Sequence, residues 1–494
     1  MNVHHYIACD LGAETGRVIL GTLDGEKLSI EEIHRFSNKP VEITNALHWD
    51  VVYLFEELKF GLRKAASRGV PIESISCDSW GVDYVLLKGK EPFLSAPFHY
   101  RDKRTDGALE RAFAIVGEED IFAETGIQFM PINTLYQLLA DLRDRPSLLD
   151  EAEQFLNVGD YFNYLLSGVP QAEESLASTS QLYNPRHRTW STALIHKFGL
   201  PPKIFPEIVK SGTILGNLLP SVRGDKNFQG TKIVAGCSHD TGAAVAAVPT
   251  QSKGWAYLSS GTWSLLGVEL QEPIINAKSL EYGFTNEVGY GGSILFLKNI
   301  TGLWIVQECR RAWSKENKEY SYEQLTEMAE AAAPFDSYIN VMDPRFAKPD
   351  DMPAKVAEFC KSTDQRMPGT PGEIVRCVLS SLAMLYRQTL DQVEELTGNA
   401  ITTLHIVGGG SKNDLLNQFA ANATRRTIFT GPVECSAIGN IIVQAITLGH
   451  IPSLEAARAV VRNSFPLVRF NPQDDPLWET GVRKYLAAFQ QEEA

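Results

Sequence analysis

The chain has 494 residues, of which 44% are hydrophobic and 21% are charged, and this balance is typical of a folded globular protein rather than a disordered one. Its formal net charge is -14, which argues against a nucleic-acid or anionic-membrane partner, because binding to such surfaces needs an excess of Lys and Arg. We therefore expect a small-molecule partner.

The length predicts two domains, with four small ones as the alternative. The seven cysteines are dispersed and no two are three residues apart, which argues against zinc ribbons and redox pairs and indicates reduced thiols. Residues 1–6 do not resemble a signal peptide, and no apolar run approaches the roughly 18 residues of a membrane span. We expect a cytoplasmic protein, a monomer or a homodimer.

The first motif is a short apolar strand, Tyr6–Cys9, followed by Asp10-Leu11-Gly12-Ala13-Glu14-Thr15-Gly16-Arg17 and a second apolar strand. Glycines at 12 and 16 allow a tight turn with accessible amide groups, as a phosphate cradle requires. An ordinary β-hairpin explains the same residues. Asp10 favours the phosphate interpretation, because a carboxylate beside a phosphate loop commonly holds magnesium.

A helix is predicted to begin after Asp50, its N-cap, and to end before Gly69-Val70-Pro71. The strand Ile72–Cys77 then leads into Asp78-Ser79-Trp80-Gly81-Val82-Asp83. This order of three strands, a helix and a strand differs from a Rossmann unit. Trp80, Gly81 and Asp83 suit a sugar site, although Trp80 also suits the core.

Another apolar strand, Thr231–Gly236, leads into Cys237-Ser238-His239-Asp240-Thr241-Gly242 and a small-residue helix. Asp240 is well placed to act as a base, and the alternative is a side-chain cap of that helix. The segment Glu173–Asn184, rich in Ser and Thr, is expected to be a loop.

The stretch Trp255–Val268 repeats the pattern of the first motif: strand, small polar turn, strand. Two such turns indicate a duplicated architecture, in which Thr262 and Ser264 provide a second phosphate contact; two unrelated hairpins are the alternative. Residues 248–254 are the best linker, so we predict an N-terminal sugar-binding domain over 1–245 and a C-terminal nucleotide-binding domain over 246–494.

A long helix is predicted over Pro371–Gly398, with Thr370 and Glu373 in capping-box positions. The strand Thr403–Val407 runs into Gly408-Gly409-Gly410, and a helix is expected from Asn413 to Ala423. Three glycines leave room for a ring or a phosphate near a helix N-terminus, although a flexible turn explains them equally. With the two phosphate-loop candidates, they suggest an adenosine site.

These motifs, in this order and spacing, resemble the FGGY carbohydrate kinases. The resemblance runs from Tyr6 to at least Gly439 and includes the motifs around Asp10, Trp80, Asp240 and Gly408 together with Tyr100-Arg101-Asp102, Asn133-Thr134-Leu135-Tyr136-Gln137-Leu138, Ser259-Ser260-Gly261-Thr262-Trp263-Ser264 and Lys298-Asn299-Ile300. It implies an α/β fold with two ribonuclease H-like (actin-like ATPase) domains, an interdomain cleft, and ATP and Mg2+ as cofactors.

The resemblance also implies roles for individual residues. Asp240 would be the general base, Gly81, His239 and Asn299 would contact the sugar, and Asp10 would be associated with the metal. The nucleotide would be lined by Ala13, Glu14, Thr15, Gly16, Arg17, Thr262, Gln307 and Gly409. Glu14-Thr15 departs from the two small hydroxyl-type residues expected there, and the Glu14 carboxylate would repel the nucleotide unless it points outward or assists magnesium.

The implied reaction transfers the γ-phosphoryl group of ATP to the 1-hydroxyl of L-rhamnulose, with Asp240 accepting the hydroxyl proton. One alternative is a kinase for another ketose or polyol, such as L-fuculose or xylulose. The other is a non-catalytic nucleotide switch on the same fold.

Overall fold

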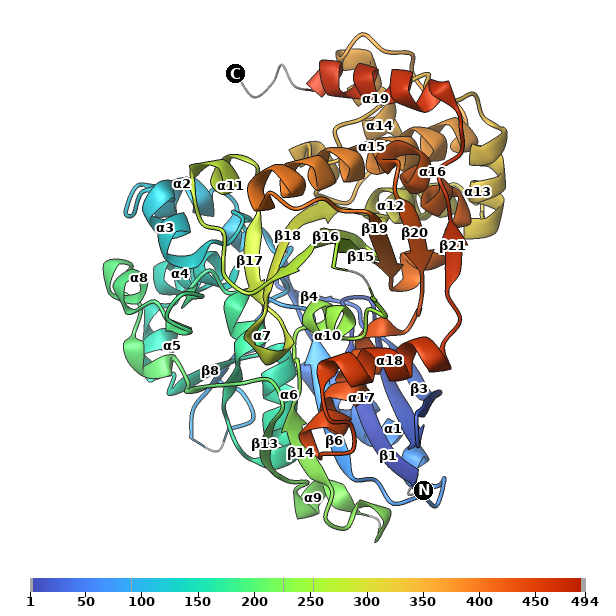
Figure 1. Cartoon of the computed structure of the whole chain (residues 1–494). Coiled ribbons are helices and arrows are strands. Elements are labelled where there is room, and N and C mark those ends of the chain that lie inside the picture. Colours follow the sequence, from blue (N-terminus) through green and yellow to red (C-terminus); the bar gives the residue numbers. More distant parts are fainter. Residues whose placement is uncertain (1–2, 90, 225, 252, 490–494) are drawn as a thin grey trace. The chain divides into compact units, whose positions relative to one another are not determined.

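The computed structural model describes residues 3–89, 91–224, 226–251 and 253–489. The chain forms two compact units, each containing strands and helices (Figure 1). Unit 1 consists of Met1–Pro249, Glu269–Leu297 and Cys435–Phe465, and unit 2 consists of Thr250–Val268, Lys298–Glu434 and Pro466–Ala494. The boundary near residue 246 stays a prediction.

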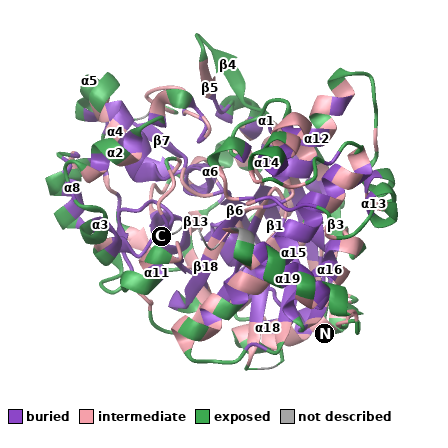
Figure 2. Cartoon of the chain, turned by 90° about the horizontal axis from the view of Figure 1, so that it is seen from above, coloured by how far each residue is buried: buried purple, intermediate pink, exposed green. Residues whose placement is uncertain are grey.

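Unit 1 contains a six-stranded sheet in the order β13-β14-β6-β1-β2-β3. Its strands are β1 (Val3–Leu11), β2 (Thr15–Asp24), β3 (Lys27–Ser37), β6 (Ser74–Ser79), β13 (Thr213–Asn217) and β14 (Lys232–Ala235). β1 pairs antiparallel with β2 and parallel with β6, and β6 pairs parallel with β14. From Tyr6 to Leu11 every residue of β1 is buried, as expected for a central strand covered on both faces (Figure 2).

The second sheet has seven strands in the order β17-β18-β16-β15-β19-β20-β21. Its strands are β15 (Trp255–Ser260), β16 (Trp263–Leu270), β17 (Thr285–Val288), β18 (Ile294–Thr301), β19 (Thr403–Val407), β20 (Thr427–Thr430) and β21 (Val468–Phe470). β15 pairs antiparallel with β16 and parallel with β19, and β19 pairs parallel with β20. The order β18-β16-β15-β19-β20 thus repeats β3-β2-β1-β6-β14, which confirms the duplicated architecture and makes the alternative of two unrelated hairpins wrong.

The two helices predicted from capping signals are present. α1 (Val51–Ala66) begins after Asp50, whose side chain accepts a hydrogen bond from the Tyr53 amide. α15 (Pro371–Thr397) begins at a capping box of Thr370 and Glu373 and ends at left-handed Gly398. The longer helices elsewhere are α4 (Thr134–Asp144), α6 (Val158–Ser167), α12 (Trp304–Lys315), α13 (Tyr322–Ala331), α14 (Met352–Ser362), α16 (Asp414–Thr424), α17 (Cys435–Thr447), α18 (Leu454–Ser464) and α19 (Pro476–Phe489).

Smaller elements fill the rest of unit 1. They are β4 (Val41–Ile43), β5 (Ala46–His48), β7 (Tyr84–Leu87), α2 (Ala108–Phe113), α3 (Glu118–Thr125), α5 (Pro146–Glu151), β8 (Gln154–Asn157), β9 (Ala172–Glu173), α7 (Glu174–Ser178), β10 (Tyr183–Asn184), β11 (Thr189–Trp190), α8 (Thr192–Lys197), β12 (Ile208–Val209), α9 (Pro220–Arg223), α10 (Asp240–Ala246) and α11 (Ala277–Glu281).

Among the described residues, no helix is both long enough and apolar enough to cross a membrane.

The prediction of a loop over Glu173–Asn184 was wrong. The segment contains the short helix α7, and every residue from 172 to 185 is buried. Its hydroxyls make local hydrogen bonds, such as Ser178 Oγ to the Ser175 carbonyl at 2.7 Å and Ser180 Oγ to the Ala177 carbonyl at 2.6 Å. Because buried polar groups are tolerated when they are hydrogen-bonded, a composition rich in Ser and Thr did not exclude burial.

Unit 1 is completed by a segment from the far end of the chain. Helix α17 packs against α10, β1 and β6, and Figure 1 shows α17 and α18 in red beside the blue strands β1 and β3. Gln444 on α17 accepts a hydrogen bond from Ser74 Oγ at 2.6 Å and donates one to the Ile7 carbonyl at 3.0 Å. These bonds satisfy polar groups on the buried face of the helix.

Candidate active site

Three carboxylates meet at the carboxyl ends of the central strands of unit 1. Asp10 on β1 lies directly across from Asp78 on β6, and Asp240 follows β14 as the first residue of α10. The strand ends are linked by hydrogen bonds from the Ser79 amide to the Ser238 carbonyl at 2.9 Å and from the Trp80 amide to the Leu11 carbonyl. Because these strands are parallel, their carboxyl ends share one edge of the sheet, as ligand sites in such sheets do.

The interpretation of Asp240 as a side-chain helix cap is wrong. The N-cap of α10 is His239, and its side chain makes no capping bond. The Asp240 side chain is 29% exposed and accepts a hydrogen bond from Thr241 Oγ1 at 3.2 Å. Burial raises the pKa of Asp240, and the nearby His239 partly offsets this effect. A raised pKa makes the carboxylate a better proton acceptor.

His239 lies between two carboxylates. Its Nε2 atom is 3.5 Å from Asp240 Oδ1, and its Nδ1 atom is 3.2 Å from Glu287 Oε2. Burial lowers the pKa of His239, but the charges of Glu287, Asp240 and Glu173 outweigh burial and hold the pKa above 6.5. When the imidazole is protonated, its charge favours the ionised form of Asp240, the proposed base.

The turn that carries His239 and Asp240 is held by two side chains that sequence reasoning missed. Glu173 accepts a hydrogen bond from the Ser238 amide at 3.0 Å, and Ser175 Oγ accepts one from the His239 amide at 3.0 Å. Burial raises the pKa of Glu173 to about 7, although bonds from Ser175 and Ser211 lower it. The available signal was two adjacent acids, Glu173-Glu174, in a segment otherwise rich in small hydroxyl residues.

Asp10 and Asp78 form a buried acidic pair. Arg17 donates a hydrogen bond to Asp10 Oδ2 at 2.5 Å, and Asn440 donates one to Asp78 Oδ2 at 2.5 Å. Burial and the charge of Asp10 raise the pKa of Asp78 well above its ordinary value. Asp78 Oδ1 is buried and has no hydrogen-bond partner among the described residues. An unpaired carboxylate oxygen beside a second carboxylate fits a divalent cation, which prefers oxygen ligands.

The turn between β1 and β2 is compact. The Gly12 amide bonds to the Thr15 carbonyl at 3.0 Å, and Asn38 Nδ2 bonds to the Gly12 carbonyl at 2.8 Å. Glu14 is exposed and Ala13 is half-buried. A Cβ atom at Gly16 would lie 2.3 Å from the Phe36 ring, so packing alone requires glycine there.

Gly81 lies in the turn after β6, near the turn that carries His239. A Cβ atom at Gly81 would come 2.9 Å from Thr179 Oγ1, which accepts a hydrogen bond from the Val82 amide at 3.1 Å. Val82 has a φ of 66°, an uncommon conformation for a β-branched residue. The turn is therefore tightly constrained by the α7 segment.

Asp83 does not present its carboxylate to a sugar. It is fully buried and accepts hydrogen bonds from Trp49 Nε1 at 2.5 Å, Trp80 Nε1 at 3.0 Å and Gln137 Nε2 at 2.7 Å. Trp80 is buried and packs against Trp49 at 4.2 Å between ring centroids, so the core interpretation of Trp80 is correct. The cluster positions the Gly81 turn.

In unit 2, the turn of the hairpin formed by β15 and β16 is hydrogen-bonded to the start of α12. The Leu303 amide bonds to the Gly261 carbonyl at 3.1 Å, and the Trp304 amide bonds to the Thr262 carbonyl at 3.2 Å. Gln307 is on the first turns of α12, and its Oε1 atom is buried with no partner among the described residues. Thr262 and Gln307 thus lie on neighbouring elements, and Asn299 is buried on β18.

The triple glycine differs from its prediction in one respect. Its second and third glycines form the start of a 3-10 helix, η6 (Gly409–Lys412), and α16 begins after it at Asp414 with the N-cap Asn413. Cβ atoms at Gly408 and Gly410 would lie 2.9 Å from the Ser260 carbonyl and 2.0 Å from Ser260 Oγ, so these two glycines allow close packing on β15. A Cβ atom at Gly409 would meet nothing within 4 Å, so this glycine borders open space.

Within each unit, the structure brings the predicted residues together. Unit 1 holds Asp10, Ala13, Glu14, Thr15, Gly16, Arg17, Gly81, His239 and Asp240, and unit 2 holds Asn299, Thr262, Gln307 and Gly409. The residues that sequence reasoning missed are Asp78, Glu173, Ser175, Glu287 and Asn440. Their roles and those of the predicted residues stay predictions.

Comparison with known proteins assigns the class. The N-terminal domain of the FGGY family of carbohydrate kinases matches residues 5–247, and the C-terminal domain of that family matches residues 256–448. The chain therefore belongs to the FGGY family of carbohydrate kinases, and it is an ATP-dependent sugar kinase.

Proteins named rhamnulokinase are similar over nearly the whole chain. The one from Bacteroides thetaiotaomicron is 41% identical over 96% of this chain and 97% of its own length. The one from Bacillus subtilis is 38% identical over 95% and 96%.

Solved structures of the family share the fold. A xylulose kinase from Lactobacillus acidophilus has a TM-score of 0.81 at 14% identity and covers 99% of this chain and 97% of its own. Plasmodium falciparum glycerol kinase with ADP has a TM-score of 0.77 at 15% identity, with coverage of 100% and 97%. The predicted α/β fold with two ribonuclease H-like, actin-like domains is confirmed.

Proposed function

We propose that the chain transfers the γ-phosphoryl group of ATP to the 1-hydroxyl of L-rhamnulose. The observation that carries the catalytic part is the Asp240 carboxylate, which is partly exposed at a strand end beside His239. The choice of sugar is supported by relatives at 38–41% identity that are named rhamnulokinase.

Asp240 would accept the hydroxyl proton as the new P–O bond forms, since such transfers depend mainly on positioning and on neutralising charge. His239 would hydrogen-bond the sugar, and Glu287 would hold the imidazole in place. Gly81 and Asn299 would complete the sugar contacts.

The nucleotide would be bound by the turn Ala13–Arg17 and by Thr262, Gln307 and Gly409. Gln307 Oε1, which has no partner in the described part of the chain, and the open space beside Gly409 support this assignment. The exposed position of Glu14 removes the main objection to a phosphate at the first turn, because an exposed carboxylate is screened by water.

Asp10 and Asp78 are the residues that would hold Mg2+. When bound, the ion would neutralise charge on the phosphates. Arg17, which bonds to Asp10, can contact a phosphate only by changing partner or by using its other nitrogen atoms. The cytoplasmic location and the state of monomer or homodimer stay predictions.

A panel of ketoses assayed by ADP release tests the proposal. L-rhamnulose should be among the best substrates, ahead of L-fuculose and xylulose, and Asp240→Asn should remove the sugar-dependent ADP release. A preference for another ketose would refute the assignment of the sugar but leave the kinase class intact. ATP binding without phosphorylation of any sugar would instead favour a nucleotide switch.

A further inference from the structure

A cluster of two histidines and one glutamate lies at the opposite end of β1 from Asp10. His4 is near the start of β1, Glu73 immediately precedes β6, and His450 follows α17. Six residues of strand at about 3.3 Å each place His4 roughly 20 Å from Asp10. The kinase mechanism proposed above uses none of these three residues.

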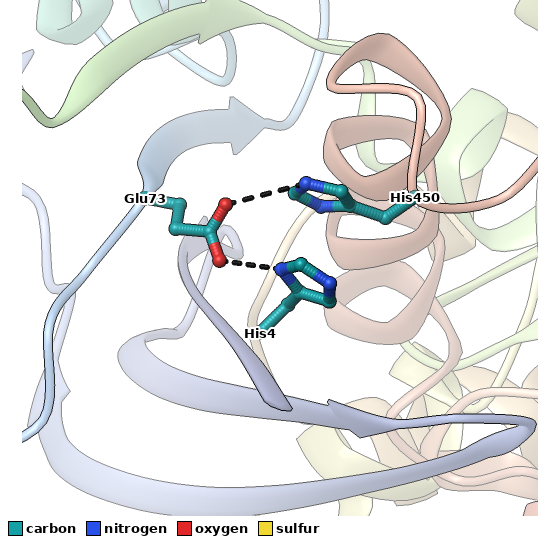
Figure 3. A group of neighbouring side chains, drawn as sticks. All are labelled: His4, Glu73 and His450. Atoms are coloured by element: carbon teal, nitrogen blue, oxygen red, sulfur yellow. Dashed lines mark hydrogen bonds and ion pairs between the residues drawn. The ribbon is translucent and has the colours of Figure 1, made fainter. Parts of the chain in front are cut away.

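The three side chains converge on a small volume. His4 Nδ1 is 2.6 Å from Glu73 Oε1, and His450 Nε2 is 3.4 Å from Glu73 Oε2. Figure 3 shows one carboxylate oxygen facing each imidazole. One ligand atom from each of the three side chains lies within 4.8 Å of the other two.

The two imidazoles contact each other. The His4 and His450 rings stack with centroids 3.6 Å apart and an interplanar angle of 18°. Because the lone pair of a ring nitrogen lies in the ring plane, one ring must turn out of this stack for both imidazoles to bind one ion. The Tyr6 hydroxyl forms a hydrogen bond with His450 Nδ1 at 2.7 Å, so Nε2 is the nitrogen turned toward Glu73. Metal-bound histidines almost always use their second ring nitrogen in such a bond, which fixes the orientation of the ring.

The alternation of side chains along β1 explains why His4 and Tyr6 both contact this cluster and His5 does not. Alternate residues of a strand point to the same face, so His4 and Tyr6 share one face of β1 and His5 points to the other. His5 Nδ1 instead lies 3.1 Å from Thr22 Oγ1 on β2. His5 is therefore a matched control of the same residue type at the adjacent position.

We propose that His4, Glu73 and His450 bind a divalent transition-metal ion, with zinc as the preferred ion. A nitrogen ligand and an oxygen ligand at about 2.0–2.2 Å from a tetrahedral zinc ion lie roughly 3.4 Å apart. The His450–Glu73 separation of 3.4 Å equals that value, whereas the His4–Glu73 separation of 2.6 Å must widen when the ion binds. Imidazole and carboxylate ligands suit zinc, and three protein ligands leave a fourth position for water.

The site is accessible to an ion from solution. The side chains of His4, Glu73 and His450 are 21%, 33% and 19% exposed. The bound ion would join three segments that are far apart in the sequence: the first strand, the start of β6 and the turn between α17 and α18. It would therefore stabilise unit 1, because an ion that binds only the folded state shifts the folding equilibrium toward that state.

The ordinary alternative is a carboxylate that pairs with two imidazoles and binds no metal. A titration of Zn2+ into the full chain, stripped by a chelator and free of any histidine tag, distinguishes the two. Calorimetry should give one ion per chain, and Mg2+ should not compete. The visible absorption of bound Co2+ should report tetrahedral coordination, and Zn2+ should raise the midpoint of thermal unfolding.

Zn2+ binding by substituted chains tests whether the ion lies in this cluster. Glu73→Gln and His450→Ala should abolish the stoichiometric binding, Tyr6→Phe should weaken it about 10–100-fold, and His5→Ala should leave it unchanged. Circular dichroism checks that each variant is folded, and Glu73→Gln carries the test if His450→Ala unfolds. The proposal is overturned if the folded wild-type chain binds no Zn2+, or if Glu73→Gln binds it as tightly as wild type. Either result leaves the proposed kinase function untouched.

Discussion

Asp240 combines two properties that are usually in conflict. Burial raises its pKa, yet its side chain remains 29% exposed, so a substrate hydroxyl can reach it. A carboxylate deeper in the site would be a stronger base but would be inaccessible, as Asp78 illustrates with its fully buried side chain.

Asp240→Asn is expected to lower kcat by about 10²–10⁴-fold, the range that general-base catalysis contributes. The asparagine side chain has nearly the same shape as the aspartate it replaces, so the fold and ATP binding should be retained. Steady-state ADP release gives kcat, and calorimetric titration with ATP is the control. A variant with near-normal turnover would show that Asp240 is not the base.

The buried Glu173 makes stability depend on pH. Its folded-state pKa is about 7, above its ordinary value of 4.5. The folded state therefore holds a proton that the unfolded state has released, and the free energy of unfolding should fall as pH rises between about 4.5 and 7. Each unit of pKa difference corresponds to about 1.4 kcal/mol.

Glu173→Gln should flatten this part of the pH profile, because glutamine stays neutral while retaining an oxygen acceptor for the Ser238 amide. Urea unfolding at several pH values between about 5 and 7.5 measures the effect. Glu31→Gln, which removes an exposed carboxylate that pairs with Arg68, is the surface control for the same chemical change. An equally steep profile in Glu173→Gln would assign the pH dependence to other groups.

At the scale of elements, the contact between α10 and α17 is unusually close. A Cβ atom at Gly439 would lie 1.8 Å from the Ala243 carbonyl oxygen, and Cys435 Sγ already lies 3.2 Å from the Ala244 carbonyl. Because the obstacle is backbone, no side-chain rotation relieves it. The same contact holds the helix that carries Asp240 at its first residue.

Gly439→Ala should destabilise the chain by about 1–3 kcal/mol through overpacking, which outweighs the gain of about 1 kcal/mol that alanine gives a helix interior. Thermal or urea unfolding measures the change. Gly117→Ala is the control for added volume, since a Cβ atom there meets nothing within 4 Å. Gly117 is the N-cap of α3, so the loss of stability in this variant should be limited to the cost of a poorer cap, roughly 1 kcal/mol or less. A more stable Gly439→Ala variant would mean that the two helices can separate freely.

For the whole molecule, the division of predicted residues between the units has a measurable consequence. Of the proposed sugar contacts, Gly81 and His239 are in unit 1 and Asn299 is in unit 2. The proposed nucleotide contacts Thr262, Gln307 and Gly409 are in unit 2. Ligands slow hydrogen exchange most at the segments that they order.

Hydrogen exchange with L-rhamnulose alone should therefore protect residues 78–83 and 237–242 of unit 1 and the strand around Asn299 of unit 2. A non-hydrolysable ATP analogue should add protection at 10–17, 259–264 and 303–310, and around Gly409. Peptides from α13 serve as the internal control and should be unaffected. Protection by the sugar confined to unit 2 would contradict the assignment of a sugar-binding N-terminal domain.

Much of the fold was predictable because its signals are local. The cap at Asp50, the capping box at Thr370 and the strand Thr403–Val407 depend on residues within one or two turns of each other, and all three predictions were correct. The two hairpins were visible as repeated patterns, and the ordered motifs around Asp10, Asp240 and Gly408 were enough to suggest the family.

The assembly of the site was decided only by the tertiary structure. Asp78 meets Asp10 through strand register, and Glu173, Glu287 and Asn440 arrive from segments far from Asp240 in the sequence. Each is a buried polar group, and burial of such groups is tolerated only where distant partners satisfy them. Local sequence patterns determine where strands and helices form, but long-range pairing determines which side chains share an environment and thus which groups have shifted pKa values.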